Sequence, residues 1–220
     1  MDMERYAYRR QAFMEYEFYS EGPHGRIRKI VCFQPFFFNG LPCHNLSFGD
    51  WNEELGNVDD SAVSNNGDAG KVLATIARII LYFTTLYPDL IIHVKGRGEA
   101  KARLYQMGVN KIWSEIRELF DAYGDTGEQW EPFQKNVRYH AFLLQRIEYV
   151  NLEEQNTCYM PSSTKKTNKK KLERVELIEF IVPEPSTNPF LIRKMEDARK
   201  SFETSGFPRE LFERNRSRIK

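Results

Sequence analysis

One histidine and one aspartate in the middle of the sequence could each accept a proton from a substrate. His93 lies in the β-branched run LIIHVK, which predicts a short buried strand over residues 90–95. A strand histidine can face a cleft and act as a general base, or it can be an ordinary core histidine with satisfied hydrogen bonds. Asp60 follows Asp59 in a second predicted strand, residues 57–64. A carboxylate there could deprotonate an amine, or it could belong to a polar face or a turn.

Basic residues gather where the first of these strands ends. Lys95, Arg97, Lys101 and Arg103 could bind the phosphate of a nucleotide, a coenzyme or RNA. A solvated basic face is the alternative interpretation. The four histidines of the chain are scattered without the spacing of zinc ligands, so we expect no metal site. The sequence also has no Ser-His-Asp, Cys-His or P-loop pattern.

A long helix is predicted directly before the histidine strand. The turn NNGDAG, residues 65–70, leads into a helix over residues 69–87, because apolar residues recur there at helical spacing. These residues are Val72, Ile76, Ile79, Ile80, Phe83 and Leu86. Asn66 or Asp68 can cap the start of this helix, and Pro88 ends it.

The N-terminal third predicts an antiparallel meander. Residues 13–20 and 26–33 alternate apolar and polar side chains and form a hairpin with a longer loop. Residues 35–42, PFFFNGLP, read as a hydrophobic loop, either folded over the core or exposed to a partner or ligand. Residues 43–51 and 57–64 add two further strands.

The rest of the body adds helices and a last strand. A second helix is predicted over residues 99–107, with Gly108 as its C′ residue. A third helix starts at Asn110 and is broken by glycines from Gly124 onward. Residues 139–147 form the last strand. The predicted class is α+β, an antiparallel meander sheet packed with helices and followed by a C-terminal strand–helix tail.

The C-terminal third differs in composition from the body. We predict a domain over residues 1–150, a basic flexible linker over 151–172 and a docking segment over 173–220. Within the segment, residues 175–182 are strand-like, and residues 189–204 form an amphipathic helix that starts with Pro189 at its first position. An apolar stripe on that helix needs a groove, either on this chain's own body or on a second copy.

Charge, cysteine content and the lack of long apolar runs indicate which partners and which cellular compartment to expect. The formal charge is +1, which argues against strong nucleic-acid binding, although residues 151–220 carry 15 Lys and Arg against 11 Asp and Glu. Three cysteines without CxxC spacing indicate buried or free thiols in a reducing compartment. No secretory signal is visible, and the longest apolar run is too short for a bilayer. We expect a cytoplasmic protein that does not enter membranes.

The central stretch resembles the second half of the N-acetyltransferase superfamily, the GNAT fold. The features that carry the likeness are the order meander, helix, strand and then the segment AKARLYQMG over residues 100–108, which holds the pair Leu104-Tyr105 and ends in Gly108. The resemblance implies acetyl-CoA or another acyl-CoA, whose pyrophosphate is held by backbone N–H groups at a helix start. The corresponding residues are Asn66, Gly67, Asp68, Gly70 and Lys71, with Arg97 as a further phosphate ligand. It also implies that Tyr105, from the L-Y pair, protonates the departing thiolate.

A closer resemblance is to an uncharacterised bacterial domain family, and it covers residues 3–148. It rests on SEGPHGRI, NLSFGDWNEELGNVDD, SNNGDAGKVLATIA, ARLYQMGVNK and WEPFQKN. No activity is implied by this family. The tail lies outside it and looks like a fused small partner, as in toxin–antitoxin gene pairs.

Two functions follow as hypotheses. The first is an acyl-CoA-dependent N-acyltransferase, acting as a toxin with a fused antitoxin-like tail. The second is a non-catalytic protein-binding or oligomerisation module on a GNAT-like scaffold. The absence of the Arg/Gln-x-x-Gly-x-Gly/Ala signature favours the second, whereas the helix-start turn, the basic strand end and Tyr105 favour the first.

Overall fold

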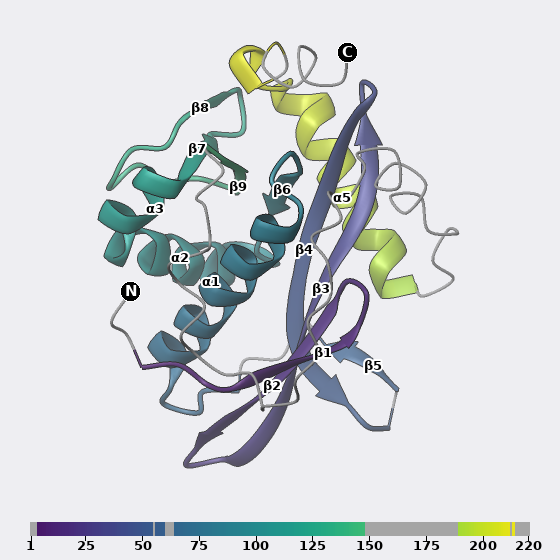
Figure 1. Cartoon of the computed structure of the whole chain (residues 1–220), viewed down its shortest axis with the longest axis vertical. Helices are drawn as coiled ribbons and strands as arrows, with labels where there is room; N and C mark the ends of the chain where they lie inside the picture. The colour runs from purple at the N-terminus through teal and green to yellow at the C-terminus, as the bar shows by residue number, and fades with distance from the viewer. Residues whose placement is uncertain (1–3, 55, 60–63, 148–188, 212, 214–220) are drawn as a thin grey trace, which may run out of the picture.

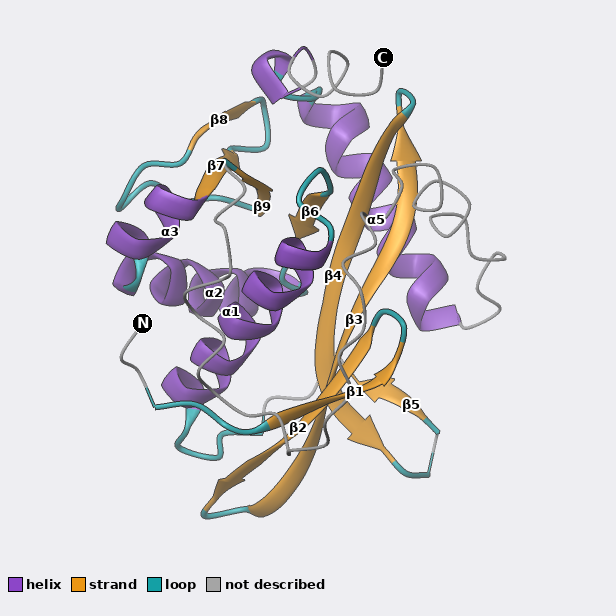
Figure 2. Cartoon of the chain, in the orientation of Figure 1, coloured by secondary structure: helices purple, strands orange, loops and turns teal. Residues whose placement is uncertain are grey.

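The computed structural model describes residues 4–54, 56–59, 64–147, 189–211 and 213, which form a mixed α+β fold (Figure 1). The strands are β1 (Tyr8–Ala12), β2 (Glu15–Gly22), β3 (Gly25–Phe38), β4 (Leu41–Asn52), β5 (Asn57–Asp59), β6 (Ile91–Val94), β7 (Phe120–Asp125), β8 (Trp130–Pro132) and β9 (Ala141–Arg146). The helices are α1 (Ala69–Leu86), α2 (Gly98–Lys111), α3 (Trp113–Leu119) and α5 (Pro189–Ser205). Helices α1 to α3 lie on one side of the long strands β3 and β4, and α5 lies on the other (Figure 2). The predicted α+β class is confirmed.

The nine described strands form one open sheet in the order β1-β2-β3-β4-β6-β9-β7-β8, with β5 also paired to β4. All pairs are antiparallel except β4 with β6. Parallel neighbours need a crossover connection, and α1 lies in that connection. The predicted N-terminal meander is present as β2 to β5, and β1 is a further strand that the sequence analysis did not predict. The strands predicted over residues 90–95 and 139–147 correspond to β6 and β9.

The hairpin turns are tighter than the sequence pattern predicted. Asn39 and Gly40 alone join β3 to β4, and their φ angles of 49° and 78° are the positive values that a type I′ turn requires. The prediction of a hydrophobic loop over residues 35–42 is therefore wrong. Phe36 is a buried strand residue, whereas Phe37, on the other face, is 48% exposed. The β2–β3 hairpin likewise closes with a two-residue turn in place of the longer loop we expected.

Helix α1 forms the core of one side of the sheet, and its bounds confirm the helix predicted over residues 69–87. Its buried side chains are Val72, Ala74, Thr75, Ile76, Ile79, Ile80, Phe83 and Thr84. The ring of Phe83 stacks on that of Phe33 from β3, with centroids 3.8 Å apart. Among the described residues, α1 alone is long and apolar enough to span a membrane, a test that core helices of soluble proteins also pass.

Helices α2 and α3 depart from the predicted boundaries. α2 continues through Gly108 to Lys111, so Gly108 is not a C′ residue. Its lack of a side chain serves packing instead, because a Cβ at that position would lie 2.8 Å from Cδ1 of Leu73 on α1. α3 ends at Leu119, and Phe120 starts β7, which pairs with β9 where we expected the helix to continue. Pairing with a strand that is distant in sequence overrides the local helical period here.

Helix α5 covers the second side of the sheet, and it confirms the helix predicted over residues 189–204. Its Phe202 is buried in a cluster with residues of six strands. The strand members are Phe36, Leu41, Cys43, Ile91, Tyr123, Trp130, Ala141 and Leu143. Asp125 of β7, which is 3% exposed, accepts hydrogen bonds from the hydroxyls of Ser201 and Ser205, each at 2.6 Å. This buried carboxylate therefore holds α5 through two polar contacts beside the apolar ones.

Removing both hydroxyls should loosen α5. The double variant Ser201→Ala, Ser205→Ala would leave the Asp125 carboxylate with a single described donor, the N–H of Gly127 at 2.8 Å. Hydrogen bonds to a charged group contribute about 1.5 to 3 kcal/mol each, so we expect a loss of about 3 kcal/mol in urea unfolding of the full chain. Thr204→Ala, at an exposed position of the same helix, is the control. Equal stability of the double variant and the control would contradict the assignment.

The predicted linker over residues 151–172 and the predicted strand over 175–182 lie outside the described residues. The division of the chain into a domain, a linker and a docking segment therefore remains a prediction. Of the tail, the structure describes α5 and residues 206–211 and 213 after it.

Candidate functional site

The parallel strand pair marks one end of the sheet as a candidate ligand site. β4 and β6 stay in register up to Leu46 opposite Val94. Beyond that point β4 continues to Asn52 beside β5, whereas β6 ends and the chain turns into α2. In open sheets, ligands bind at the carboxyl ends of neighbouring strands, where the connections to the helices leave the sheet. The carboxyl end of β6, beside Leu46 of β4, is such a position.

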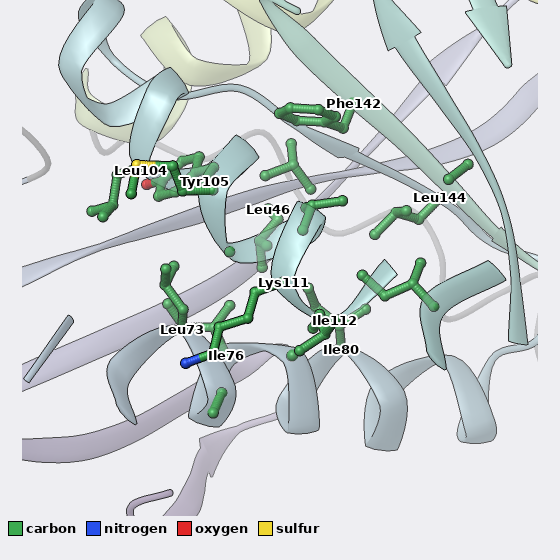
Figure 3. Close-up of a pocket in the computed structure, with 18 of the residues that line it drawn as sticks. Leu46, Leu73, Ile76, Ile80, Leu104, Tyr105, Lys111, Ile112, Phe142 and Leu144 are labelled. Atoms are coloured by element: carbon green, nitrogen blue, oxygen red, sulfur yellow. The ribbon is translucent and has the colours of Figure 1, made fainter. Parts of the chain in front are cut away.

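An apolar cavity of about 290 Å³ lies at this position, between α1, α2 and the sheet (Figure 3). β4 contributes Leu46 and Phe48 to its wall, and β6 contributes Val94. Of the residues that line it, only Tyr105 and Lys111 carry polar side-chain groups. Small-molecule sites are typically apolar hollows of about 300 to 1,000 Å³ with few polar groups. The cavity is therefore suited to an apolar group of modest size, such as a hydrocarbon chain.

Tyr105 lies in the wall of this cavity, on the α2 side (Figure 3). It is half-buried, and its ring centroid is 6.1 Å from that of Phe48. Ala69 and Gly70, from the first turn of α1, line the same cavity. The structure thus brings Tyr105 together with part of the predicted helix-start turn.

Asn66 in that turn joins the start of α1 to the β2–β3 turn through hydrogen bonds. It is 3% exposed, and its side-chain amide donates to the Ser20 hydroxyl at 2.9 Å and to the carbonyl of Gly25 at 3.0 Å. Its side-chain oxygen accepts from the N–H of His24 at 2.9 Å. These bonds fasten the β2–β3 turn to the start of α1. Gly67 follows with φ of 74°, a left-handed conformation that favours glycine.

The next residues of the turn are bound to the N-terminal segment. Asp68 occupies the N-cap position of α1 without a capping bond from its side chain, and its carboxylate accepts the Tyr6 hydroxyl at 2.8 Å. Lys71 pairs with Glu4 at 2.6 Å and lies over the Tyr6 ring, 4.3 Å from its centroid. Burial, together with the nearby Asp68 carboxylate, raises the pKa of Tyr6. The first backbone bond of the helix runs from Val72 to Asp68, so the preceding N–H groups are not part of the helical pattern.

His93 lies on the opposite face of the sheet from Tyr105. Its ring is completely buried, with centroids 5.4 Å from Phe202 of α5 and 6.1 Å from Trp130 of β8. Its Nδ1 is 2.9 Å from Oδ1 of Asn45, and its Nε2 has no hydrogen-bond partner among the described residues. Burial, with the charge of nearby Lys95, lowers the pKa of His93 to about 3. The imidazole is therefore neutral at physiological pH.

A polar layer surrounds His93, and sequence analysis missed it. Asn45 donates to Gln34 Oε1 at 3.2 Å and to the Ser47 hydroxyl at 3.1 Å, and Ser47 donates to Gln34 at 2.9 Å. All four side chains are buried. The alternation of Asn45 and Ser47 with the apolar Leu46 and Phe48 was a signal that one face of β4 is polar. Nothing local indicated that this polar face would be buried.

The remaining predicted residues are not brought into the apolar cavity. Arg97 is exposed at the N-cap position of α2 and lines neither this cavity nor the second, polar one. The polar cavity, about 320 Å³, opens where β6 leads into α2 and is lined by residues that include Lys95, His140 and Lys200. Asp60 lies outside the described residues. Within the described ranges, no group of three His, Cys, Asp or Glu side chains could hold a metal ion.

Comparison with known proteins identifies a family whose function is unknown. A model described as a family of unknown function (DUF6934) matches residues 2–147, which include the nine described strands and α1 to α3. No curated protein and no solved structure matches the chain, so the likeness to N-acetyltransferases has no support from a relative. The sequence-based assignment to an uncharacterised family over residues 3–148 is confirmed. Because the match covers more than half of its residues, the chain belongs to this family of unknown function, DUF6934.

Proposed function

We propose that this chain binds an acyl-CoA thioester in the apolar cavity at the carboxyl end of β6 and acts as a GNAT-like N-acyltransferase. The observation that carries the proposal is the apolar cavity, whose wall combines Tyr105 with Ala69 and Gly70 of the first turn of α1. An acyl or pantetheine chain is apolar enough for this cavity, and a pyrophosphate is suited to the helix start beside it. The order of elements, from the meander through α1, β6 and α2, agrees with the resemblance.

Different residues at the cavity would bind the pyrophosphate, orient the acyl chain and protonate the leaving group. The backbone N–H groups of the first turn of α1 and the Lys71 ammonium would hold the pyrophosphate, offset by the Asp68 carboxylate that Tyr6 already binds. The apolar wall would exclude water from the acyl chain and orient it. Tyr105, as the one hydroxyl of the wall, would protonate the departing thiolate.

On the opposite face, α5 would act as a restraint. It covers the part of the sheet that holds His93, the residue predicted to act as base. His93 is buried beneath this helix and lies across the sheet from the cavity, so it cannot reach an acceptor beside Tyr105 in this arrangement. Under this proposal α5 has the role of a fused antitoxin-like tail, which keeps a toxic transferase inactive.

A non-catalytic binding module is the second candidate. It is favoured by the composition of the cavity wall, which offers Tyr105 and Lys111 but no carboxylate or histidine that could serve as a base. Under this alternative the chain holds an apolar ligand or a partner without transferring anything.

Titration of acetyl-CoA into the full chain tests the proposal. A ligand at 100 times its dissociation constant stabilises the fold by about 2.7 kcal/mol, which a thermal shift detects. Gly70→Glu should weaken binding at least about tenfold, because a carboxylate would face the pyrophosphate, whereas the neutral Gly70→Gln should bind almost as the wild type does. Both substitutions suit the fold, since no atom lies within 4 Å of a Cβ at Gly70.

Release of the coenzyme A thiol in the presence of an amine then separates the two candidates. Thiol release that falls in Tyr105→Phe supports the transferase. Binding without release supports the module. Absence of binding to the wild-type chain would refute an acyl-CoA site of either kind.

A further inference from the structure

The polar cavity lies where three separate parts of the chain meet. Its volume of about 320 Å³ is within the range of small-molecule sites. Its wall is formed by the segment between β6 and α2, by residues at the end of β7 and just before β9, and by the last turns of α5. The side chains that make this wall polar include Lys95, Asp125, His140, Lys200, Ser201 and Ser205. The cavity is therefore a polar space between the sheet and α5, and the proposed function does not use it.

Strand alternation places Lys95 on the side of the sheet that α5 covers. Ile91 of β6 belongs to the apolar cluster beneath α5, and the ring of His93 lies 5.4 Å from that of Phe202. Side chains along a strand alternate between its two faces, so Lys95, two residues after His93, points to the same side. The charge of Lys95 acts on His93, which agrees with this placement. The Lys95 ammonium group is thus directed toward α5 and away from the apolar cavity.

Lys95 and Lys200 bring two ammonium groups to the polar cavity from elements that are distant in sequence. Within the part of the chain that the structure describes, neither side chain forms an ion pair or a hydrogen bond. Like charges that share a cavity repel one another, and the repulsion grows as protein replaces water around them. A bound anion would replace this repulsion with two attractions. The convergence of the two lysines therefore points to an anionic ligand.

Asp125 is the one carboxylate among the described residues of the wall, and its oxygens are already bound. Oδ2 accepts the Ser201 hydroxyl, and Oδ1 accepts the Ser205 hydroxyl and the N–H of Gly127. Three donors of the protein thus face this carboxylate, and neither lysine lies within ion-pair distance of it. The two lysines and the single carboxylate leave an excess of positive charge in the cavity, before any charge on His140 is counted.

The start of α2 adds backbone donors to the same cavity. α2 begins at Gly98, which is part of the wall, and its N-cap residue, Arg97, makes no side-chain capping bond. The first N–H groups of a helix have no partner within the helix and carry the positive end of its dipole. Gly96 and Gly98 lack a Cβ that would separate a ligand from the backbone here, and a Cβ built at Gly98 meets no atom within 4 Å. These donors supplement the two ammonium groups.

We infer that the polar cavity binds a small phosphorylated molecule, whose phosphoryl group lies between the ammonium groups of Lys95 and Lys200. A phosphate monoester carries nearly two negative charges at neutral pH, so it matches two ammonium groups better than a carboxylate does. Lysine ammonium groups and helix-start N–H groups are common phosphate donors in proteins. This site is separate from the apolar cavity, and it stands or falls independently of the acyl-CoA proposal.

The bound phosphoryl group would also join α5 to the sheet. Lys95 belongs to the segment after β6, whereas Lys200 belongs to α5, so a ligand that contacts both binds only while α5 lies on the sheet. A ligand that binds one arrangement of a protein stabilises that arrangement by mass action. The phosphorylated molecule therefore strengthens the attachment of α5.

Calorimetric titration of inorganic phosphate into the full chain, at constant ionic strength, tests the site. We expect saturable binding at one site, which chloride at the same ionic strength does not reproduce. Lys95→Met and Lys200→Met should each weaken binding about tenfold or more, because each removes a hydrogen bond to a charged group. Lys135→Met, at an exposed lysine outside the cavity, should bind as the wild type does.

Hydrogen exchange of the α5 amides tests the link to the helix. Phosphate should slow exchange in residues 190–205 of the wild type, and it should not do so in Lys200→Met. Phosphate binding without slower exchange in α5 would overturn the joining role. Wild-type exchange rates of Lys200→Met without phosphate would show that the substitution acts on the ligand and leaves the packing of α5 intact.

Three results would overturn the phosphate site. The first is the absence of saturable phosphate binding to the wild type. The second is unchanged binding in Lys200→Glu, a charge reversal at an exposed position that does not endanger the fold. The third is loss of phosphate binding in Gly70→Glu, which would place the phosphate at the start of α1. Failure of acetyl-CoA to bind would refute only the proposed function, since the phosphate titration contains no coenzyme.

Discussion

Replacing Ile79 with aspartate should abolish cooperative folding of this chain. Ile79 is 0% exposed in the centre of α1, within the cluster that joins the helix to the sheet. A carboxylate there would be buried without a partner, at a cost of about 5 kcal/mol or more. The total stability of a domain is about 5 to 15 kcal/mol, so one such change can remove most of it. Thermal melting followed by circular dichroism is the measurement.

The matched control is Leu86→Asp, near the exposed end of the same helix. Leu86 is 40% exposed, so its replacement removes little buried surface. A negative charge near the helix C-terminus is unfavourable by about 1 kcal/mol at most. A sharp melting transition of the Ile79→Asp variant close to that of Leu86→Asp would show that α1 does not form the core.

Acidification should destabilise the chain through two buried histidines. Burial lowers the pKa of both His44 and His93 to about 3, whereas in the unfolded chain both titrate near 6.5. Below pH 6.5 the unfolded state therefore binds protons that the folded state does not, and stability falls as the pH falls toward 3. Between pH 7 and pH 5 each histidine should remove about 2 kcal/mol, or about 4 kcal/mol together. Urea unfolding at the two pH values measures the loss.

His44→Leu isolates one of these contributions. His44 is completely buried beside Phe83, with a ring-centroid distance of 5.6 Å, and neither ring nitrogen has a partner among the described residues. Leucine can fill this space without titrating. Carboxylates contribute to the acid effect equally in both chains, so the variant should lose about 2 kcal/mol less than the wild type. The same loss in both chains would contradict the assignment of neutral, buried imidazoles.

The sequence alone determined the elements whose signals are local. The helical spacing of apolar residues over 69–87 and the proline at residue 189 defined α1 and α5. The alternation in the first third defined the meander. These patterns depend on residues within a few positions of one another, so they can be recognised in the sequence without knowledge of the fold. Boundaries such as Phe120 were wrong because pairing between β7 and β9 joins residues that are distant in sequence.

Only the tertiary structure decided how the candidate site residues are grouped. Strand alternation placed His93 and Val94 on opposite faces of β6, but it could not tell which helix covers each face. The structure places Tyr105 by the apolar cavity on the α1 side and His93 in the polar layer beneath α5. It also uses Asn66 to fasten the β2–β3 turn, through partners more than 40 residues away. Such contacts depend on which surfaces pack together, and that is a property of the whole chain.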